Sequence, residues 1–244
     1  MSPTITWATA KRVLTQLSHD HRTVALLVLV PSLLMVLLRF VFDDDAAFDA
    51  IGLPLLGVFP LVIMFLVTSV AMLRERTSGT LERLLTTPMH KLDLLLGYGI
   101  AFALAAALQA AVATGTAYLL LGLDTQGFWG WVVVVAVANA VLGMALGLLI
   151  SAFARSEFQA VQFMPAVVLP QFLTCGLLIS RDQMAGWLEA ISNVLPMSYA
   201  VEGLQEIGAN SSLTSTLVRD LGVVLGATVI ALGLGALTLR RRSG

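Results

Sequence analysis

Three histidines are the residues of this 244-residue chain whose type most readily supports catalysis. His19, His21 and His90 all stand near the edges of long apolar blocks. No pair of carboxylates falls inside an apolar block, as proteolysis or proton transfer within a membrane would require. We therefore expect no catalytic and no metal-binding residue in this chain.

Residues 74–88 place charges and leucines around a turn signal. Ser78-Gly79 favours a turn, and Pro88 disfavours helix at Thr87. The spacing therefore predicts a short helix over residues 80–86.

The leucines of this short helix lie on one face, opposite its polar residues. An apolar face of this kind could rest on lipid or enter a groove of a cytosolic partner. The residues alone leave both alternatives open. The leucines are Leu81, Leu84 and Leu85, and the residues facing away are Glu82, Arg83 and Thr86.

The chain that must position these residues is unusually apolar. Hydrophobic residues make up 58% and charged residues 12% of the sequence, and the mean hydropathy is +0.90. Since a soluble domain carries about 25% charged residues, an ordinary soluble enzyme is excluded. The single cysteine excludes an internal disulfide.

Six apolar blocks are each long enough to cross a hydrocarbon layer about 30 Å thick. They predict an all-α integral membrane protein with six transmembrane helices, forming one domain over residues 1–244. The longest stretch outside them, residues 181–216, is too short for a soluble core of its own. The predicted spans are residues 23–42, 52–73, 94–121, 128–153, 161–180 and 217–239.

The charges predict an orientation. With the N-terminus in the cytoplasm, only Arg39, Arg181 and Arg219 of the fourteen Lys and Arg residues lie outside, where most acids gather. Basic residues in short loops set orientation, so both termini are expected in the cytoplasm, in a multi-pass protein of the plasma or inner membrane. The alternative, a signal peptide over residues 23–42, conflicts with a run longer than the usual ~7–15 apolar residues.

The first 22 residues carry a helical stripe of their own. Trp7, Ala10, Leu14 and Leu17 recur at helical steps beside basic residues. This pattern predicts a cytoplasmic amphipathic helix over residues 1–22, lying in the headgroup layer.

Small residues recur four apart in two spans, and they favour close packing of helices within this chain. The residues are Asn139, Gly143, Gly147 and Ser151 in the fourth span, and Gly222 and Gly226 in the sixth. Residues 181–216 contain a further helical pattern, in which Trp187, Leu188, Ile191 and Leu195 recur and a second short helix is predicted over residues 197–207.

Two motifs resemble those of the type-2 permeases of ATP-binding-cassette (ABC) exporters. Residues 75–88 follow the family's Glu-Arg-x-x-Gly-Thr-Leu-Glu-x-Leu-Leu-x-Thr-Pro, and Leu94-Leu95-Leu96-Gly97-Tyr98 continues it. Before the last span, Pro196-Met197-Ser198-Tyr199 is followed by Gln205, as in the family. With the six-span layout, the resemblance covers nearly the whole chain. Residues 173–180 lack the family's Phe-Pro pair, which leaves the geometry of the outer loop open.

The resemblance implies that the short helix over residues 80–86 couples the permease to a separate ATPase. No Gly-x-x-x-x-Gly-Lys-Ser/Thr loop occurs in the 244 residues, so ATP and Mg²⁺ are expected on the partner ATPase and no cofactor on this chain. The expected partners are two cytosolic ABC ATPase subunits, a second permease copy or sister permease, and membrane lipid, but not nucleic acid. The expected ATPase-coupling residues are Arg74, Glu75, Arg76, Gly79, Thr80, Leu81, Glu82, Leu84, Leu85, Thr87 and Pro88.

In the same family the segment before the last span forms re-entrant helices that close the exit. The resemblance therefore implies an outer gate formed by Trp187, Pro196, Tyr199 and Gln205. The alternative is a pair of interfacial helices without a gating role.

The chain looks most like the daunorubicin-resistance branch, which implies ATP-driven export of a lipophilic, drug-like compound. An exporter of a lipid or lipid-linked glycan is the alternative within the family. Outside the family, the alternative is a channel or structural membrane protein without ATP coupling. Adaptable apolar side chains in the second and fifth spans suit a substrate path, or equally packing and lipid contact; they are Phe59, Met64, Phe65, Phe163, Met164 and Phe172.

Overall fold

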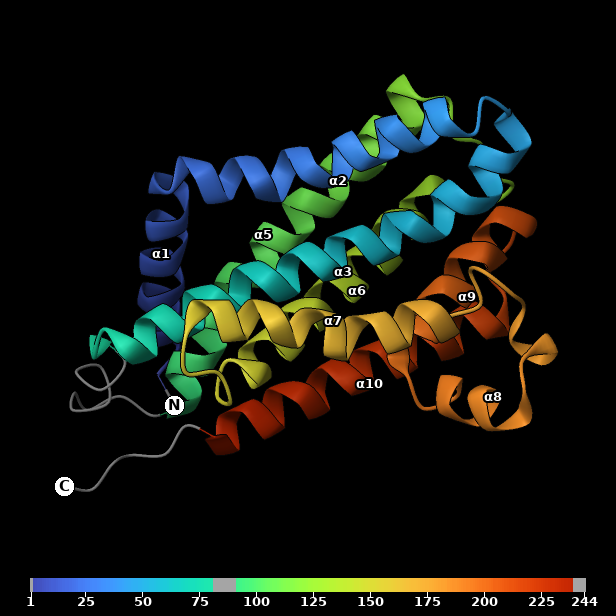
Figure 1. Ribbon diagram of the computed structural model, residues 1–244. Helices are drawn as coiled ribbons and strands as arrows, with labels where there is room; N and C mark the ends of the chain where they lie inside the picture. Colours follow the sequence, from blue (N-terminus) through green and yellow to red (C-terminus); the bar gives the residue numbers. More distant parts are fainter. Residues whose placement is uncertain (1, 81–90, 239–244) are drawn as a thin grey trace.

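A computed structural model describes residues 2–80 and 91–238, and within these ranges it contains helices and loops but no strand. The all-α expectation is confirmed for this part of the chain. The elements are α1 (Pro3–His19), α2 (His21–Val41), α3 (Asp45–Thr77), α5 (Lys91–Leu120), α6 (Trp129–Ile150), α7 (Glu157–Thr174), the 3₁₀ turn η1 (Arg181–Gln183), α8 (Gly186–Ser192), α9 (Pro196–Ala209) and α10 (Ser215–Thr238) (Figure 1).

Five of the six predicted spans are confirmed as helices long and apolar enough to cross a membrane: α2, α3, α5, α6 and α10. The fifth predicted span, residues 161–180, differs from expectation. Its helix α7 ends at Thr174, because the chain leaves the helix at Cys175 and turns at Gly176, whose φ is +91°. The crossing of the membrane by α7 stays a prediction.

The long helices lie side by side, and the two ends of the bundle differ (Figure 1). One end, called here the α1 end, holds α1, the last turns of α3 and the last turn of α10. The opposite end, called the α8 end, holds α8 and the loops around it. The start of α1 and the end of α10 therefore lie at the same end of the bundle.

The centre of the bundle is the contact of α3 with α6. A Cβ atom added to Gly143 would lie 2.3 Å from the carbonyl oxygen of Leu61, and one added to Gly147 would lie 2.6 Å from that of Phe65. The small residues of α6 therefore let the two backbones meet, which confirms the packing expected for the fourth span. The same expectation is wrong for Gly222 and Gly226 of α10, which face open space in the described chain.

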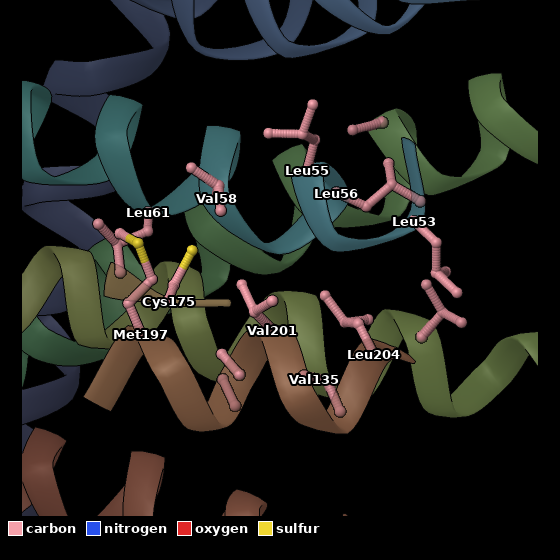
Figure 2. Packing of buried hydrophobic residues seen from close by; sticks show 14 of the residues in the cluster. Leu53, Leu55, Leu56, Val58, Leu61, Val135, Cys175, Met197, Val201 and Leu204 are labelled. Atoms are coloured by element: carbon pink, nitrogen blue, oxygen red, sulfur yellow. The ribbon is translucent and has the colours of Figure 1, made fainter. Parts of the chain in front are cut away.

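Helix α9 lies inside the bundle, where it packs on α3, α6 and α10. Its buried side chains, among them Met197, Val201 and Leu204, meet Leu53 and Leu61 of α3 in one apolar cluster (Figure 2). The helix predicted over residues 197–207 is thus confirmed, and its burial distinguishes it from a helix lying on the surface.

The predicted N-terminal helix is confirmed as α1, which stands across the end of α2 in Figure 1. Three residues of the predicted stripe are on the packed face, since Ala10 is buried and Leu14 and Leu17 are half-buried against the same apolar cluster, but Trp7 is 62% exposed and Thr9 is buried instead. Gly97 of α5 allows α1 to approach closely, because a Cβ atom at this position would lie 2.6 Å from the Cβ of Thr9.

Candidate functional site

The expected coupling segment begins in the last turn of α3. Arg74, Glu75 and Arg76 belong to that helix, which ends at Thr77. Gly79 has a φ of +72°, so the predicted turn is confirmed, and Thr80 is helical again. The other expected coupling residues lie outside the described residues: Leu81, Glu82, Leu84, Leu85, Thr87 and Pro88.

Arg74 connects the end of α3 to the first turn of α7. Its Nε donates to Oε1 of Glu157 at 2.6 Å, and its Nη2 donates to Oε2 at 3.0 Å. The hydrogen bonds from Arg74 hold the pKa of Glu157 below its ordinary value, although burial acts in the other direction. Sequence patterns did not find Glu157, since the two residues are far apart in the chain.

Glu75 takes part in a second connection, with Arg12 of α1 and Tyr98 of α5. The Nη2 of Arg12 donates to the Tyr98 hydroxyl at 2.6 Å and lies 3.8 Å from Oε1 of Glu75. The guanidinium carbon also lies 5.6 Å from the centroid of the Tyr98 ring, within the range of a cation–π contact. Tyr98 closes the first motif in the sequence, whereas Arg12 was noted there only as a basic residue beside the apolar stripe of residues 1–22.

The start of α1 is tied to the first turn of α5 by Asp93. Its carboxylate accepts from the backbone nitrogen of Ser2 at 3.1 Å and from the Thr6 hydroxyl at 3.4 Å. A carboxylate beside the first turn of a helix also complements the positive end of the helix dipole. The helix α1 is therefore fixed to α5 at its start by Asp93 and near its middle by the contact of Arg12 with Tyr98.

A cluster of charges forms the candidate gate at the α8 end. The Glu202 carboxylate of α9 accepts from Arg181 at 2.6 Å and from Arg219 at 2.8 Å. Both guanidinium carbons also lie near the ring of Tyr199, at 5.3 Å and 5.8 Å from its centroid. The Tyr199 hydroxyl donates to the carbonyl of Asn193 at 2.7 Å. One short helix is thereby linked to η1, to the end of α8 and to α10.

The four expected outer-gate residues are only partly brought together. Tyr199 and Gln205 line the same polar cleft of about 450 Å³, with Arg181 and Arg219 on its wall. Pro196 begins α9, where its fixed φ suits the first turn. Trp187 lies apart on α8, 67% exposed, beside an apolar groove of about 790 Å³. The two arginines were visible in the sequence as isolated basic residues on the acidic side, but Glu202 carried no such signal.

The residues expected along a substrate path fall into two groups. Met64 and Phe65 of α3 are fully buried in this chain, where they pack in its two largest apolar clusters. The others are half-buried on α3 and α7: Phe59, Phe163, Met164 and Phe172. The path stays a prediction, and in this arrangement the half-buried group is the more accessible part of it.

Residues 4–207 match the family described as ABC-2 type transporter. The chain is 27% identical over 182 residues to the probable multidrug ABC transporter permease YbhS of Escherichia coli K12, which covers 74% of this chain and 48% of the relative. It is 26% identical over 200 residues to the linearmycin resistance permease LnrN of Bacillus subtilis, covering 81% and 50%.

A third relative aligns over most of both chains. The probable doxorubicin resistance ABC transporter permease DrrC of Mycobacterium tuberculosis is 24% identical over 243 residues, covering 95% of this chain and 87% of the relative. The first two relatives are longer, so the chain spans about half of their length. Because the family match covers most of the chain and five of the described helices are long and apolar enough to cross a membrane, this multi-pass membrane protein belongs to the ABC-2 type transporter permease family.

Proposed function

We propose that this chain is the membrane-spanning subunit of an ABC exporter, which moves a lipophilic, drug-like compound outward with ATP hydrolysed by a separate subunit. The observation that carries the proposal is the way α3 ends. The helix ends at Thr77 and the chain turns at Gly79, and just before that turn Arg74 and Glu75 contact α7 and α1. The names of the relatives as multidrug, linearmycin and doxorubicin resistance permeases support the substrate class.

The link from ATPase to membrane follows from these contacts. A force applied to the segment after Gly79 reaches α3 directly, α7 through Arg74 and Glu157, and α1 through Glu75, Arg12 and Tyr98. Packed helices respond to such a force by moving as rigid bodies rather than by deforming. Two ATPase subunits below and a second permease copy or sister permease beside this chain complete the proposed assembly.

In this proposal α7 crosses the membrane as the fifth of six spans, and the α1 end faces the cytoplasm. The basic residues of the sequence at that end support the orientation. A labelling experiment tests it after Cys175 is replaced by serine. A cysteine introduced at Asp44 is expected to react with a membrane-impermeant reagent added to sealed cells, and one at Ser243 is not. Labelling at Ser243 from outside would refute the orientation.

Copurification tests the partner. The chain is expected to bring down a nucleotide-binding protein from native membranes. Leu84→Asp places a charge on the face proposed to enter a groove of that protein, where an unpaired charge is costly. Thr86→Asp is the matched control, because the spacing places Thr86 on the opposite face. Wild-type recovery of the ATPase with Leu84→Asp would contradict the coupling role. Transport by the purified chain alone would favour a channel.

The turn itself gives a separate test. Proline holds φ near −65°, so Gly79→Pro cannot adopt the +72° observed. The variant is expected to keep part of its ATPase binding and to lose substrate-stimulated hydrolysis. Equal losses of binding and of coupling would contradict a role in directing the helix.

A further inference from the structure

A cleft of about 490 Å³ lies at the α1 end, enclosed by α1, α2, α3 and α5. Its volume is within the range of sites for drug-sized ligands, about 300–1,000 Å³. The expected substrate-path residues are not among those that line it. The cleft is also distinct from the polar cleft at the α8 end, with which it shares no residue.

The lining changes from apolar to charged along one face of α3. Leu66, Val67 and Val70 line the inner part, and Arg74 and Glu75 follow within about three helical turns. Phe102 of α5 adds an aromatic wall. A ligand that matches this gradient has an apolar body toward the middle of the bundle and one polar group at the α1 end.

The charges at the polar rim favour a cationic group over an anionic one. Arg74 directs two of its donors at Glu157, outside the cleft. Arg12 donates to Tyr98 and stays 3.8 Å from Glu75, beyond hydrogen-bond distance. Oε2 of Glu75 is buried and has no hydrogen-bond partner among the described residues. A buried carboxylate oxygen without a donor is costly, and a ligand ammonium or amino group would supply that donor.

A second carboxylate stands at the same rim. Asp20 accepts from the backbone nitrogen of Thr23 at 3.1 Å and from its hydroxyl at 2.7 Å. These hydrogen bonds hold the pKa of Asp20 below its ordinary value, so its carboxylate is ionised at neutral pH. Among the described residues that line the cleft, two of the three charged ones are therefore acids, and the third, Arg74, is already paired with Glu157.

We infer that this cleft binds an amphiphilic cation, with the apolar body against Leu66, Val67 and Phe102 and the nitrogen of the ligand near Glu75. That the bound cation is the exported compound rests on the proposed function. Binding itself requires neither ATP nor the partner.

Equilibrium binding to the purified full-length chain in lipid nanodiscs tests the inference. The probes are rhodamine 6G, a cationic aromatic dye with N–H donors, and 1-anilinonaphthalene-8-sulfonate, an anionic fluorophore. Rhodamine 6G is expected to bind saturably, with affinity reduced at least tenfold in Glu75→Gln. Weak binding of the anionic probe is expected to stay the same in that variant. Equal affinity for both probes, or rhodamine binding unchanged by Glu75→Gln, would overturn the choice of a cation.

Filling the cleft locates the ligand. Ala71 lines the cleft and is half-buried, so Ala71→Trp is expected to abolish saturable rhodamine binding. Ala111→Trp, at an exposed position of α5, is the matched control and should bind as the wild type does. If Ala71→Trp does not fold, as judged by size-exclusion profile, Ala71→Leu replaces it. Binding that survives filling of the cleft would refute the site.

The two proposals fail in different ways. If the wild-type chain shows no saturable rhodamine 6G binding but still associates with the ATPase and supports export, this inference alone is contradicted. Intact binding in a chain that associates with no ATPase would contradict the proposed function alone.

Discussion

Arg74 and Glu157 join two helix ends that are remote in sequence, through two parallel hydrogen bonds at 2.6 Å and 3.0 Å. Both side chains are more than half exposed. Exposed ion pairs contribute only about 0–1 kcal/mol to the free energy of unfolding. The importance of this pair therefore lies in the connection of α3 to α7 rather than in its contribution to stability. It holds the start of α7 to the last turn of α3, where the first family motif begins.

Reversing one charge of this pair should uncouple the permease without unfolding it. Arg74→Glu faces Glu157 with a like charge, and substrate-stimulated ATP hydrolysis in the complex is expected to fall severalfold. The double variant Arg74→Glu with Glu157→Arg restores the attraction and should recover most of the hydrolysis. The thermal midpoint serves as the control and should move little in either variant. Failure of the double variant to recover would show that Arg74 acts through another contact.

The same pair predicts a pH dependence of stability. The pKa of Glu157 is lowered in the folded chain, so the contribution of the pair is present above the ordinary glutamate value, about 4.3, and is lost as the pH falls through the folded value. The difference in thermal midpoint between the wild type and Glu157→Gln should therefore be constant from neutral pH to about pH 5.5 and shrink below about pH 4. Glu189→Gln on α8 is the control. A difference that changes between pH 6 and 8 would contradict this assignment.

The contact of α1 with α5 depends on a glycine. Gly97→Ala would place a Cβ 2.6 Å from the Cβ of Thr9 and 3.0 Å from the carbonyl oxygen of Thr6, so α1 must shift. Overpacking of this kind costs about 1–3 kcal/mol. Gly99→Ala is a matched control on the same helix, since no atom lies within 4 Å of the added Cβ. We expect Gly97→Ala to lower the thermal midpoint and to speed proteolysis within α1. Equal behaviour of the two variants would show that α1 packs elsewhere.

Hydropathy predicted the apolar middle of each long helix but not its ends. The second span was expected from residue 52 to 73, whereas α3 runs from Asp45 to Thr77. Asp44 caps the start, where its side chain accepts from Ala47, and the polar turns beyond the lipid continue the helix. The end of α7 was missed for a related reason. The apolar run continues to Ile179, but the positive φ of Gly176 is a backbone property that hydropathy does not include.

The exposed Trp7 of α1 and the contacts of Glu202 show a second limit. Periodicity included Trp7 in the apolar stripe of α1, but Trp7 is exposed, because the contact with α5 around Gly97 buries Thr6 and Thr9 beside Ala10. Likewise the spacing of Arg181, Glu202 and Arg219 carries no signal of contact, because three separate elements bring them together. Motifs with a local turn, such as Ser78-Gly79, were the part of the site that the sequence predicted well.

Glu202 accepts hydrogen bonds from two arginines in different surroundings, and the two interactions are expected to contribute differently to the free energy of unfolding. The side chain of Arg181 is 19% exposed, whereas that of Arg219 is 54% exposed and also pairs with Asp220 at 2.7 Å. Hydrogen bonds to charged groups contribute about 1.5–3 kcal/mol when shielded, against about 0–1 kcal/mol for an exposed pair.

Double-mutant cycles that combine Glu202→Gln with Arg181→Met or with Arg219→Met measure the two interactions separately. Coupling with Arg181 is expected to exceed coupling with Arg219 by about 1 kcal/mol in the free energy of unfolding. Glu202→Gln alone should also speed amide hydrogen exchange in residues 181–195, because η1 and the end of α8 are then held less firmly to α9. Glu206→Gln, whose carboxylate contacts only Asn210 of its own segment among the described residues, is the control for both measurements. Equal coupling of the two arginines, or exchange unchanged by Glu202→Gln, would refute the idea that this carboxylate fastens the α8 end.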